Sequence, residues 1–225
     1  MQRGDVLKGK YVLLDLIGKG GMGSVYRAEN LMTREPLAIK FMNVEFVEDK
    51  IHVERFKREI ETLKSIRHPN VVNIYDWFIP EKGEDRKPFL VMEFLEGKPL
   101  SEILKKRKKL TCKEAITIML QVLDGLECAH QKGIIHRDLG PPNVFLIHSS
   151  DKMVRVKLLD FGLAKPISSD ESISNLTSEG VLIGKPGYVP PEIFWKKTLD
   201  ARSDIFSCGM MVLKSIKAKL FLKGI

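Results

Sequence analysis

Two aspartates and an asparagine stand at spacings that suit chemistry on a phosphate ester. Asp138 and Asn143 lie five positions apart after the apolar run KGII, and Asp160 follows the apolar run VKLL within the tripeptide DFG. Phosphoryl transfer needs a carboxylate that receives the proton of the attacking hydroxyl, together with oxygen ligands for Mg²⁺. The three residues therefore predict one site that holds a base and two metal ligands.

A glycine-rich stretch precedes these residues in the chain. GKGGMGSV contains Gly18, Gly20 and Gly23, and glycines at that spacing let the backbone fold over phosphates without side chains in the way. Alone, the stretch is equally well a hairpin turn that binds nothing. Lys40 in the next strand-like run favours a phosphate site, because its cation could reach α- and β-phosphates. Glu59, on the helical segment that follows, could hold Lys40 extended through an ion pair.

The patterns of the first part of the chain predict a small sheet that carries one helix. Strand-like apolar runs occur in YVLLDLIG, PLAIKFM, VVNIYDWF and PFLVMEF. A helix is predicted over HVERFKREIETLKSI, because apolar residues repeat there at helical spacing. These residues are Phe56, Ile60, Leu63 and Ile66. We expect a sheet-rich lobe over residues 1–95.

Helical patterns dominate after Gly97. Thr111 and Glu114 have the spacing of a capping box, which predicts the start of a helix that closes near Gly133. Polar, Ser-rich residues over 168–180 predict a loop. The sequence therefore predicts an α/β (α+β) fold whose second lobe, over residues 96–225, is larger and mainly helical.

Composition excludes several classes of protein. With 225 residues, 44% hydrophobic and 29% charged, the chain is neither disordered nor collagen-like. Its three cysteines include no CxxC pair, which favours reduced thiols in the cytoplasm over a disulfide framework or a metal site. The sequence contains no apolar run of about 18 residues, so we expect no membrane segment.

The chain is basic, with a formal net charge of +8, and its densest basic run is KKRKKL at 105–110. No aromatic residue interrupts this run, so stacking on bases lacks support and we expect no nucleic-acid partner. The ordinary interpretation is a solvated turn between two helices. An acidic partner or an anionic surface is the alternative.

Taken in order, the motifs resemble the eukaryotic-type protein kinase family from about Tyr11 to about Leu213. GKGGMG, AIK, Glu59, HRD followed by Asn143, DFG and PPE stand in family order, and the GKGGMG loop is similar to that of bacterial serine/threonine kinases. The resemblance implies a two-lobed kinase fold, ATP and Mg²⁺ as cofactors, and a protein substrate. HRDLxP and GxPGY look like the Ser/Thr branch, because tyrosine-type loops usually lack Pro141.

The resemblance also implies a role for each matching residue. Asp138 orients or deprotonates the substrate hydroxyl, while Asn143 and Asp160 hold Mg²⁺. Lys40 pairs with Glu59 beside the phosphates.

Further positions are implied to contact the nucleotide. Met92 gates the back of the adenine pocket, and the backbone of Glu93 and Leu95 hydrogen-bonds the base. Three apolar side chains enclose the ring: Val25, Ala38 and Phe145. The full set that the resemblance assigns to ATP is Ile17, Gly18, Lys19, Gly20, Gly21, Met22, Gly23, Ser24, Val25, Ala38, Lys40, Met92, Glu93, Leu95 and Phe145.

The chain departs from the family pattern at three positions. Gly140 replaces the catalytic-loop lysine, Lys185 replaces the threonine of GTPGY, and Pro190 replaces the alanine of APE. In the family the first two positions are neighbours, so we predict that Lys185 supplies the missing catalytic charge. The alternative is a catalytically impaired pseudokinase that serves as an ATP-binding or interaction module. A small-molecule kinase is disfavoured by GKPGYVPPE, which in protein kinases seats a peptide.

Two further expectations follow from the resemblance. Arg137 is expected to receive a phosphate from the activation segment, where the candidate sites are Ser172, Ser174, Thr177 and Ser178. After RSDIFSCGMMVL the family continues with further helices and an arginine that pairs with the residue matching Glu192. We therefore expect the second lobe to be incomplete, and the uncovered face of residues 203–216 to favour self-association or a partner.

Overall fold

The chain forms two compact units. Unit 1 comprises Met1–Arg67 and Val72–Leu95, and unit 2 comprises His68–Val71 and Glu96–Ile225. The structure is a computed structural model in which the described residues are 1–20, 23–42, 50–80, 87–148, 154–161, 187–193 and 199–216.

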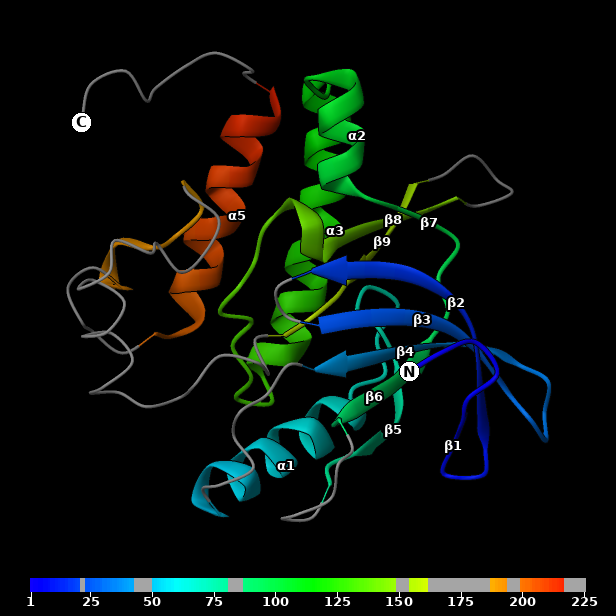
Figure 1. The fold of residues 1–225 in the computed structure, drawn as a ribbon. Helices are drawn as coiled ribbons and strands as arrows, with labels where there is room; N and C mark the ends of the chain where they lie inside the picture. Colours follow the sequence, from blue (N-terminus) through cyan, green and yellow to red (C-terminus); the bar gives the residue numbers. More distant parts are fainter. Residues whose placement is uncertain are drawn as a thin grey trace, which may run out of the picture. The chain divides into compact units, whose positions relative to one another are not determined.

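The described residues of unit 1 form a six-stranded antiparallel sheet in the order β1-β2-β3-β4-β6-β5 (Figure 1). All four predicted strand-like runs lie in it. β1 and β3 were not predicted as strands from the sequence. The strands are β1 Val6–Leu7, β2 Tyr11–Gly20, β3 Gly23–Asn30, β4 Pro36–Met42, β5 Ile74–Phe78 and β6 Phe89–Glu93.

Alternating apolar residues of these strands build the core of unit 1. Aromatic rings stack within it, with ring centroids 5.7 Å apart for Phe41 and Phe89 and 5.3 Å apart for Phe78 and Phe89. Offset and tilted pairs of this kind stabilise a core beyond the area that they bury. The buried members of the cluster are Tyr11, Leu13, Ala28, Leu37, Ile39, Phe41, Phe89 and Val91.

Helix α1, Lys50–Lys64, packs against β5 in unit 1. The predicted apolar face is confirmed, because Phe56, Ile60 and Leu63 are buried, as is Ile66 just after the helix. Trp77 of β5 donates its indole N–H to Glu61 over 2.5 Å, so a hydrogen bond also links the helix to the sheet.

Unit 2 combines helices with a second, three-stranded antiparallel sheet in the order β7-β8-β9. The sequence predicts the helices but, of this sheet, only the apolar run that becomes β9. The elements are β7 Gly97–Pro99, α2 Leu100–Arg107, α3 Cys112–His130, the 3₁₀ turn η2 Pro141–Asn143, β8 Val144–His148, β9 Val154–Leu158, the 3₁₀ turn η3 Pro191–Ile193 and α5 Ala201–Ile216.

The predicted start of α3 is confirmed. Thr111 is the N-cap, its hydroxyl accepts the Glu114 N–H over 3.2 Å, and the Glu114 carboxylate accepts the Thr111 N–H over 2.8 Å. The basic run at 105–110 covers the last three residues of α2 and part of the connection to α3, so only its second half lies in the turn that the ordinary interpretation predicts.

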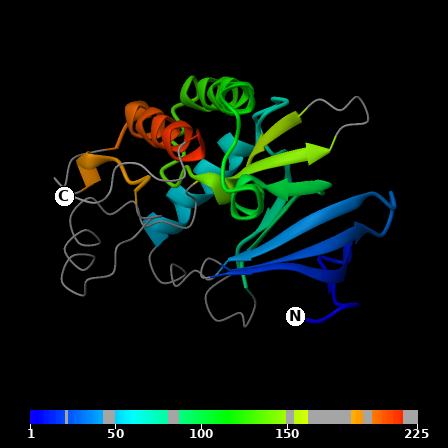
Figure 2. The same cartoon turned by 90° about the horizontal axis from the view of Figure 1, so that it is seen from above.

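Helices α3 and α5 lie side by side in unit 2 (Figures 1 and 2). They run antiparallel, because Leu110 donates its N–H to the Ser215 carbonyl over 2.8 Å at one end and His130 contacts Asp204 at the other. The opposite face of α5 exposes apolar side chains, namely Ile205, Phe206 and Leu213. Glu192 accepts a hydrogen bond from Ser203 at the start of α5.

No helix among the described residues is long and apolar enough to cross a membrane.

Candidate active site

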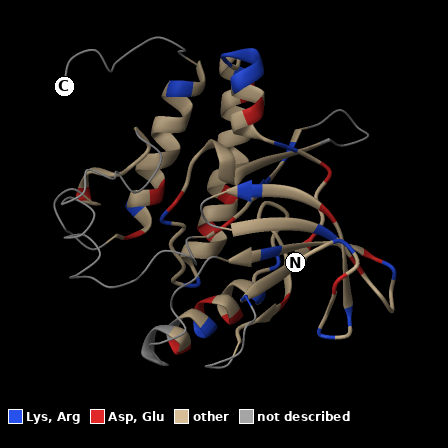
Figure 3. Cartoon of the chain, in the orientation of Figure 1, with Lys and Arg blue, Asp and Glu red and all other residues tan. Residues whose placement is uncertain are grey.

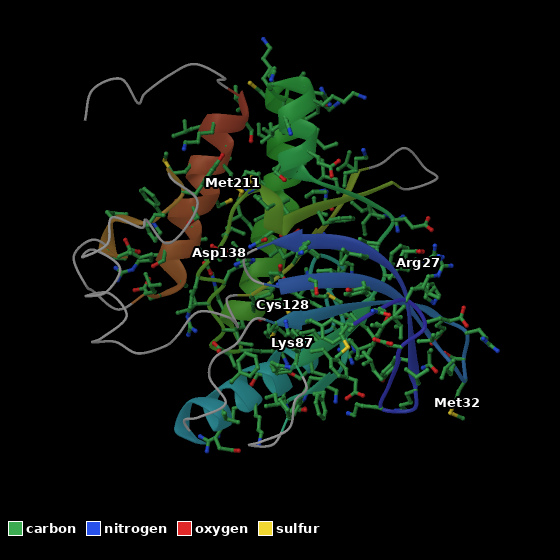
Figure 4. All side chains as sticks on the ribbon, viewed as in Figure 1. Arg27, Met32, Lys87, Cys128, Asp138 and Met211 are labelled. Atoms are coloured by element: carbon green, nitrogen blue, oxygen red, sulfur yellow. The ribbon has the colours of Figure 1, made fainter. Side chains whose placement is uncertain are left out.

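The predicted base and one predicted metal ligand contact each other in unit 2. Asp138 lies in the loop that connects α3 to η2, with 8% of its surface exposed (Figure 4). The Asn143 amide nitrogen donates to the Asp138 carboxylate over 3.1 Å and to its carbonyl over 2.8 Å. Both hydrogen bonds use the Nδ2 end of the amide. They therefore leave Oδ1 of Asn143 as the end that can meet a cation.

The backbone of this loop is strained and tied to α5. Arg137 has φ 60°, a left-handed conformation that residues other than glycine seldom adopt. Its N–H and that of His136 both donate to the Asp204 carboxylate, over 3.1 and 2.8 Å. His130 lies 2.8 Å from the same carboxylate through Nε2. Asp204, only 1% exposed, is thus the anchor that holds the loop in its strained form.

Neither His130 nor Asp204 is predicted from the sequence motifs. A signal for Asp204 does exist, because it lies within the apolar stretch DIFSCGMMVL at a position that a helix buries. A carboxylate on the buried face of a helix must be paired with donors. The sequence does not say which donors, since they lie 67 to 74 residues away.

His136 supports the loop from inside. Its side chain is fully buried, with Nε2 2.9 Å from the Leu159 carbonyl and Nδ1 3.4 Å from the Asp138 N–H. The ring packs on Phe161 at 4.7 Å. Burial lowers the pKa of His136, so the imidazole is neutral. Its partners assign the proton to Nε2, which donates to Leu159, while Nδ1 accepts from Asp138.

This neutral, buried imidazole predicts acid sensitivity. The pKa of His136 is lower in the folded chain than its ordinary value of 6.5, so the unfolded chain binds more protons below that pH. The free energy of unfolding should fall as the pH drops below about 6.5, by up to about 1.4 kcal/mol per pH unit. Chemical denaturation between pH 8 and pH 5 measures this slope.

His136→Gln should flatten the slope, because glutamine can still donate to the Leu159 carbonyl but does not titrate. His68→Gln, which removes a partly exposed histidine of the same unit, is the matched control and should retain it. Equal slopes for the parent and His136→Gln would contradict the prediction.

The two predicted metal ligands lie at the same end of the β8–β9 hairpin. Asn143 immediately precedes β8, and Asp160 follows β9 by two residues. The strands pair Val144 with Leu158, and Leu159 donates its N–H to the Asn143 carbonyl over 2.9 Å. Among the described residues no cluster of three or more His, Cys, Asp and Glu could hold a metal. Two oxygen ligands suit Mg²⁺, which is usually bound by one or two protein groups together with phosphates and water.

The glycine-rich hairpin lies in unit 1, at the end where β2 meets β3. Gly23 is required by the fold, because its φ is 136° and a Cβ there would lie 1.9 Å from the Phe41 carbonyl oxygen. Gly18 and Gly20 are not required in this way. A Cβ at Gly18 would make ordinary contact with Val25, and one at Gly20 would meet nothing within 4 Å. The space beside Gly20 is therefore open among the described residues, while Val25 lies beside Gly18.

The other predicted residues of unit 1 follow the sheet register. Lys40 on β4 is buried and pairs with Val25, while Glu59 is half-buried on α1. The Lys40–Glu59 ion pair stays a prediction. Buried Ala38 on β4 lies opposite Met92 on β6.

Residues around Met92 have a defined hydrogen-bond pattern. Glu93 donates its N–H to the Asn73 carbonyl over 3.0 Å, and its carboxylate accepts the Asn73 N–H over 2.7 Å. The Glu93 N–H is therefore engaged within the sheet. Leu95 is the last residue of unit 1 and Phe145 is on β8 of unit 2.

The remaining predicted residues of the hairpin are described in part. Lys19 pairs with Ser24, and Ile17 is exposed. Some of the predicted site residues fall outside the described residues: Gly21, Met22, Lys185 and the four candidate phosphorylation sites.

Comparison with known proteins places these features in a family. Residues 11–224 match the family described as protein kinase domain. The chain is 35% identical over 216 residues to a probable serine/threonine-protein kinase PknB of Bifidobacterium longum, covering 94% of this chain and 30% of that protein. It is 34% identical over 221 residues to the serine/threonine-protein kinase PrkC of Bacillus subtilis, covering 98% and 32%. The chain thus spans about a third of the length of these curated relatives.

A solved structure shares the fold. The kinase domain of Mycobacterium tuberculosis PknI matches with a TM-score of 0.75 at 24% identity, over 97% of this chain and 78% of that one. The sheet-rich first unit and the mainly helical second unit are those of the protein kinase fold, and the chain belongs to the protein kinase domain family.

Proposed function

We propose that this chain transfers the γ-phosphate of ATP to serine and threonine hydroxyls of protein substrates. The observation that carries the proposal is the contact between Asp138 and Asn143, because it joins a carboxylate base to a metal ligand in a strained, anchored loop. Loops held in uncommon backbone conformations are typical of sites where geometry matters for catalysis. The relatives named above are themselves serine/threonine kinases.

Asp138 acts at the acceptor hydroxyl in this proposal. As the hydroxyl oxygen bonds to the γ-phosphorus and the bond from phosphorus to the ADP oxygen breaks, the hydroxyl proton passes to the Asp138 carboxylate. The amide of Asn143 holds that carboxylate in place. Positioning of this kind contributes much of the rate in phosphoryl transfer, because little covalent chemistry is left for the protein.

The residues fit ATP and Mg²⁺. Oδ1 of Asn143 and the Asp160 carboxylate are hard oxygen donors at one end of a hairpin. The open space beside Gly20 is proposed to admit phosphates, which Lys40 is proposed to contact. Bound Mg²⁺ would neutralise charge on the β- and γ-phosphate oxygens.

Adenine recognition is proposed at the end of β6. Because the Glu93 N–H is engaged by Asn73, the group of Glu93 that would contact the base is its carbonyl, which can accept from an exocyclic amine. The backbone of Leu95 is proposed as the second contact.

One experiment tests the proposed function. The chain is incubated with γ-labelled ATP, Mg²⁺ and a generic acceptor protein, and the labelled acceptor is hydrolysed to its phosphoamino acids. We expect label on serine and threonine. Label on tyrosine alone would overturn the substrate class, and nucleotide binding without transfer would favour the pseudokinase.

Lys185 is proposed to supply the cation that Gly140 lacks. The backbone at Gly140 is extended, with φ 177° and ψ 172°, which any residue adopts, so the backbone permits a lysine at this buried position. Lys185→Thr should lower turnover by about 10²- to 10³-fold, as loss of one preorganised charge does elsewhere. Adding Gly140→Lys should restore much of it.

A double-mutant cycle of turnover measures this coupling. Additive effects of the two substitutions, or a Lys185→Thr variant within a few-fold of the parent, would contradict the proposal.

Other parts of the interpretation stay predictions. Phosphorylation of the segment that contains Thr177, with Arg137 as the receiving cation, is one. A cytoplasmic location is another, supported by three free cysteines. A partner or a second copy at the exposed apolar face of α5 is a third.

A further inference from the structure

The last turn of α2, the connection that follows it and the first turn of α3 carry a concentration of lysines. All of them are exposed, and no ion pair or hydrogen bond engages their side chains within the described part of the chain. In Figure 3 the free end of α2 is blue. We call this set the lysine cluster; its members are Lys105, Lys106, Lys108, Lys109 and Lys113.

The only arginine between positions 105 and 113 forms an ion pair within the chain. Arg107 binds Glu114 through both terminal nitrogens, over 2.8 and 3.0 Å, and Glu114 also accepts from the backbone and hydroxyl of Thr111. The hydrogen bond from Arg107 is the main reason that the pKa of Glu114 falls to about 2. Glu114 is the only acidic residue between positions 105 and 116. The lysine cluster is therefore not compensated by acidic residues close in sequence.

Two lysines of the cluster occupy positions that are unfavourable for the stability of the neighbouring helices. Lys108, the C-cap of α2, has φ 68°, a conformation that favours glycine or asparagine. Lys113 lies in the first turn of α3, where the helix dipole disfavours a cation. The helix dipole of α2 can account for the charge of Lys105 and Lys106 in its last turn and of Lys108 at its C-cap, but not for the choice of lysine at φ 68° or for Lys113. A requirement for positive charge accounts for both.

The chemistry of the cluster favours a diffuse anionic surface over a single phosphate group. Recognition of one phosphate typically uses the planar, bidentate arginine side chain. Here both terminal nitrogens of Arg107 already donate to Glu114. Lysine is a hydrated point charge on a flexible stem, which suits many exchanging headgroups. Aromatic residues that could stack on bases are absent between positions 100 and 120.

Apolar side chains continue the same face of α3. Ile116 and Leu120 follow Lys113 at helical spacing, and they are 55% and 57% exposed. Lysines beside exposed aliphatic side chains are typical of surfaces that lie in a bilayer interface, with the cations among the headgroups and the aliphatic groups below them.

We propose that the lysine cluster, together with Ile116 and Leu120, is a docking surface for an anionic lipid bilayer. Each lysine near such a surface is expected to strengthen binding about fivefold, and the effect is screened by salt. Docking here needs no membrane-spanning segment. It is also independent of phosphate transfer, because none of these residues belongs to the site that contains Asp138.

The test measures co-sedimentation of the whole chain with phosphatidylcholine vesicles that contain about one third phosphatidylserine. The variant K105Q/K106Q/K109Q should weaken binding by about 10²-fold. The matched control K10Q/K57Q/K87Q removes the same charge from exposed or partly exposed lysines of unit 1, and it should weaken binding by no more than about threefold. Pure phosphatidylcholine vesicles should not bind the parent.

A second variant separates the apolar contribution. Ile116→Ser with Leu120→Ser should weaken vesicle binding by about tenfold without changing its salt dependence. Thermal melts of all variants should match the parent, since every substituted side chain is exposed or partly exposed.

Three outcomes would overturn the proposal. Equal losses for the cluster variant and its control would assign binding to the net charge of +8 alone. Failure of the parent to bind anionic vesicles would remove the bilayer. Cluster-dependent binding to polyglutamate but not to vesicles would assign the surface to an acidic protein instead.

Discussion

Replacing Asp138 with asparagine should lower turnover by about 10³- to 10⁴-fold while changing nucleotide affinity by less than about threefold. The reason lies in the hydrogen bonds of the loop. An asparagine at this position can still accept from Asn143 through its oxygen, so the loop keeps its form. It cannot receive a proton from the acceptor hydroxyl. Initial rates with labelled ATP measure turnover, and fluorescent-nucleotide titration measures affinity.

The matched control for this substitution is Asp124→Asn. Asp124 is an exposed carboxylate on α3 of the same unit, so its replacement removes the same charge without touching the loop. Its turnover should stay within about twofold of the parent. An Asp138→Asn variant that transfers phosphate as fast as the parent would show that Asp138 is not the base.

Much of the fold can be predicted because its signals are local. The capping box of α3 needs only Thr111 and Glu114, three positions apart, and the structure contains both of its hydrogen bonds. The apolar face of α1 depends on a repeat that any helix of that sequence presents to a core. Such features depend on the chain within one or two turns, which is the range that a sequence pattern describes.

Two of the strands that were not predicted, β3 and β7, lack such a local signal. β3 contains YRAEN and β7 only GKP, and neither has a clear apolar alternation. Their backbone pairs with strands that supply the apolar residues, so pairing partners decide their conformation. A sequence pattern does not contain that information.

In the glycine-rich hairpin, residues that are equivalent in the motif have different structural roles. The motif treats Gly18, Gly20 and Gly23 alike. The structure separates them, because Gly23 avoids a clash with the Phe41 carbonyl, a Cβ at Gly18 would only touch Val25, and Gly20 has open space beside it. Substitution at Gly23 is therefore expected to affect folding first. Substitution at Gly20 can affect a bound phosphate without that cost.

The anchor of the loop that contains Asp138 could not be predicted, because it joins parts of the chain that are far apart. Asp204 meets His136 and Arg137 across 68 and 67 residues, and a contact at that range depends on how α3 and α5 pack. The motif HRD predicts the base. It does not reveal that the backbone before the base is strained, or which residue holds the strain.

Replacing Asp204 with alanine should lower the free energy of unfolding by about 3–5 kcal/mol, which is the cost of removing one partner from a buried polar network. Two backbone N–H groups and the His130 ring would lose their acceptor in a buried site. Arg137 would then relax from φ 60° toward an ordinary conformation and carry Asp138 with it. Turnover per folded molecule should fall by about 10²-fold, since displacement of a catalytic group by about 1 Å costs that much. Urea denaturation measures the first effect, and initial rates well below the melting temperature measure the second.

Two other variants distinguish anchoring from a general loss of charge. Asp200→Ala removes a carboxylate that accepts the Arg202 N–H at the start of the same helix, and it should lower stability far less than Asp204→Ala, with turnover retained. Asp204→Asn keeps one acceptor oxygen for the backbone N–H groups but loses the negative charge. It should be intermediate in stability and should recover part of the turnover. If Asp204→Ala loses stability but keeps full turnover, the carboxylate supports the fold of unit 2 without positioning Asp138.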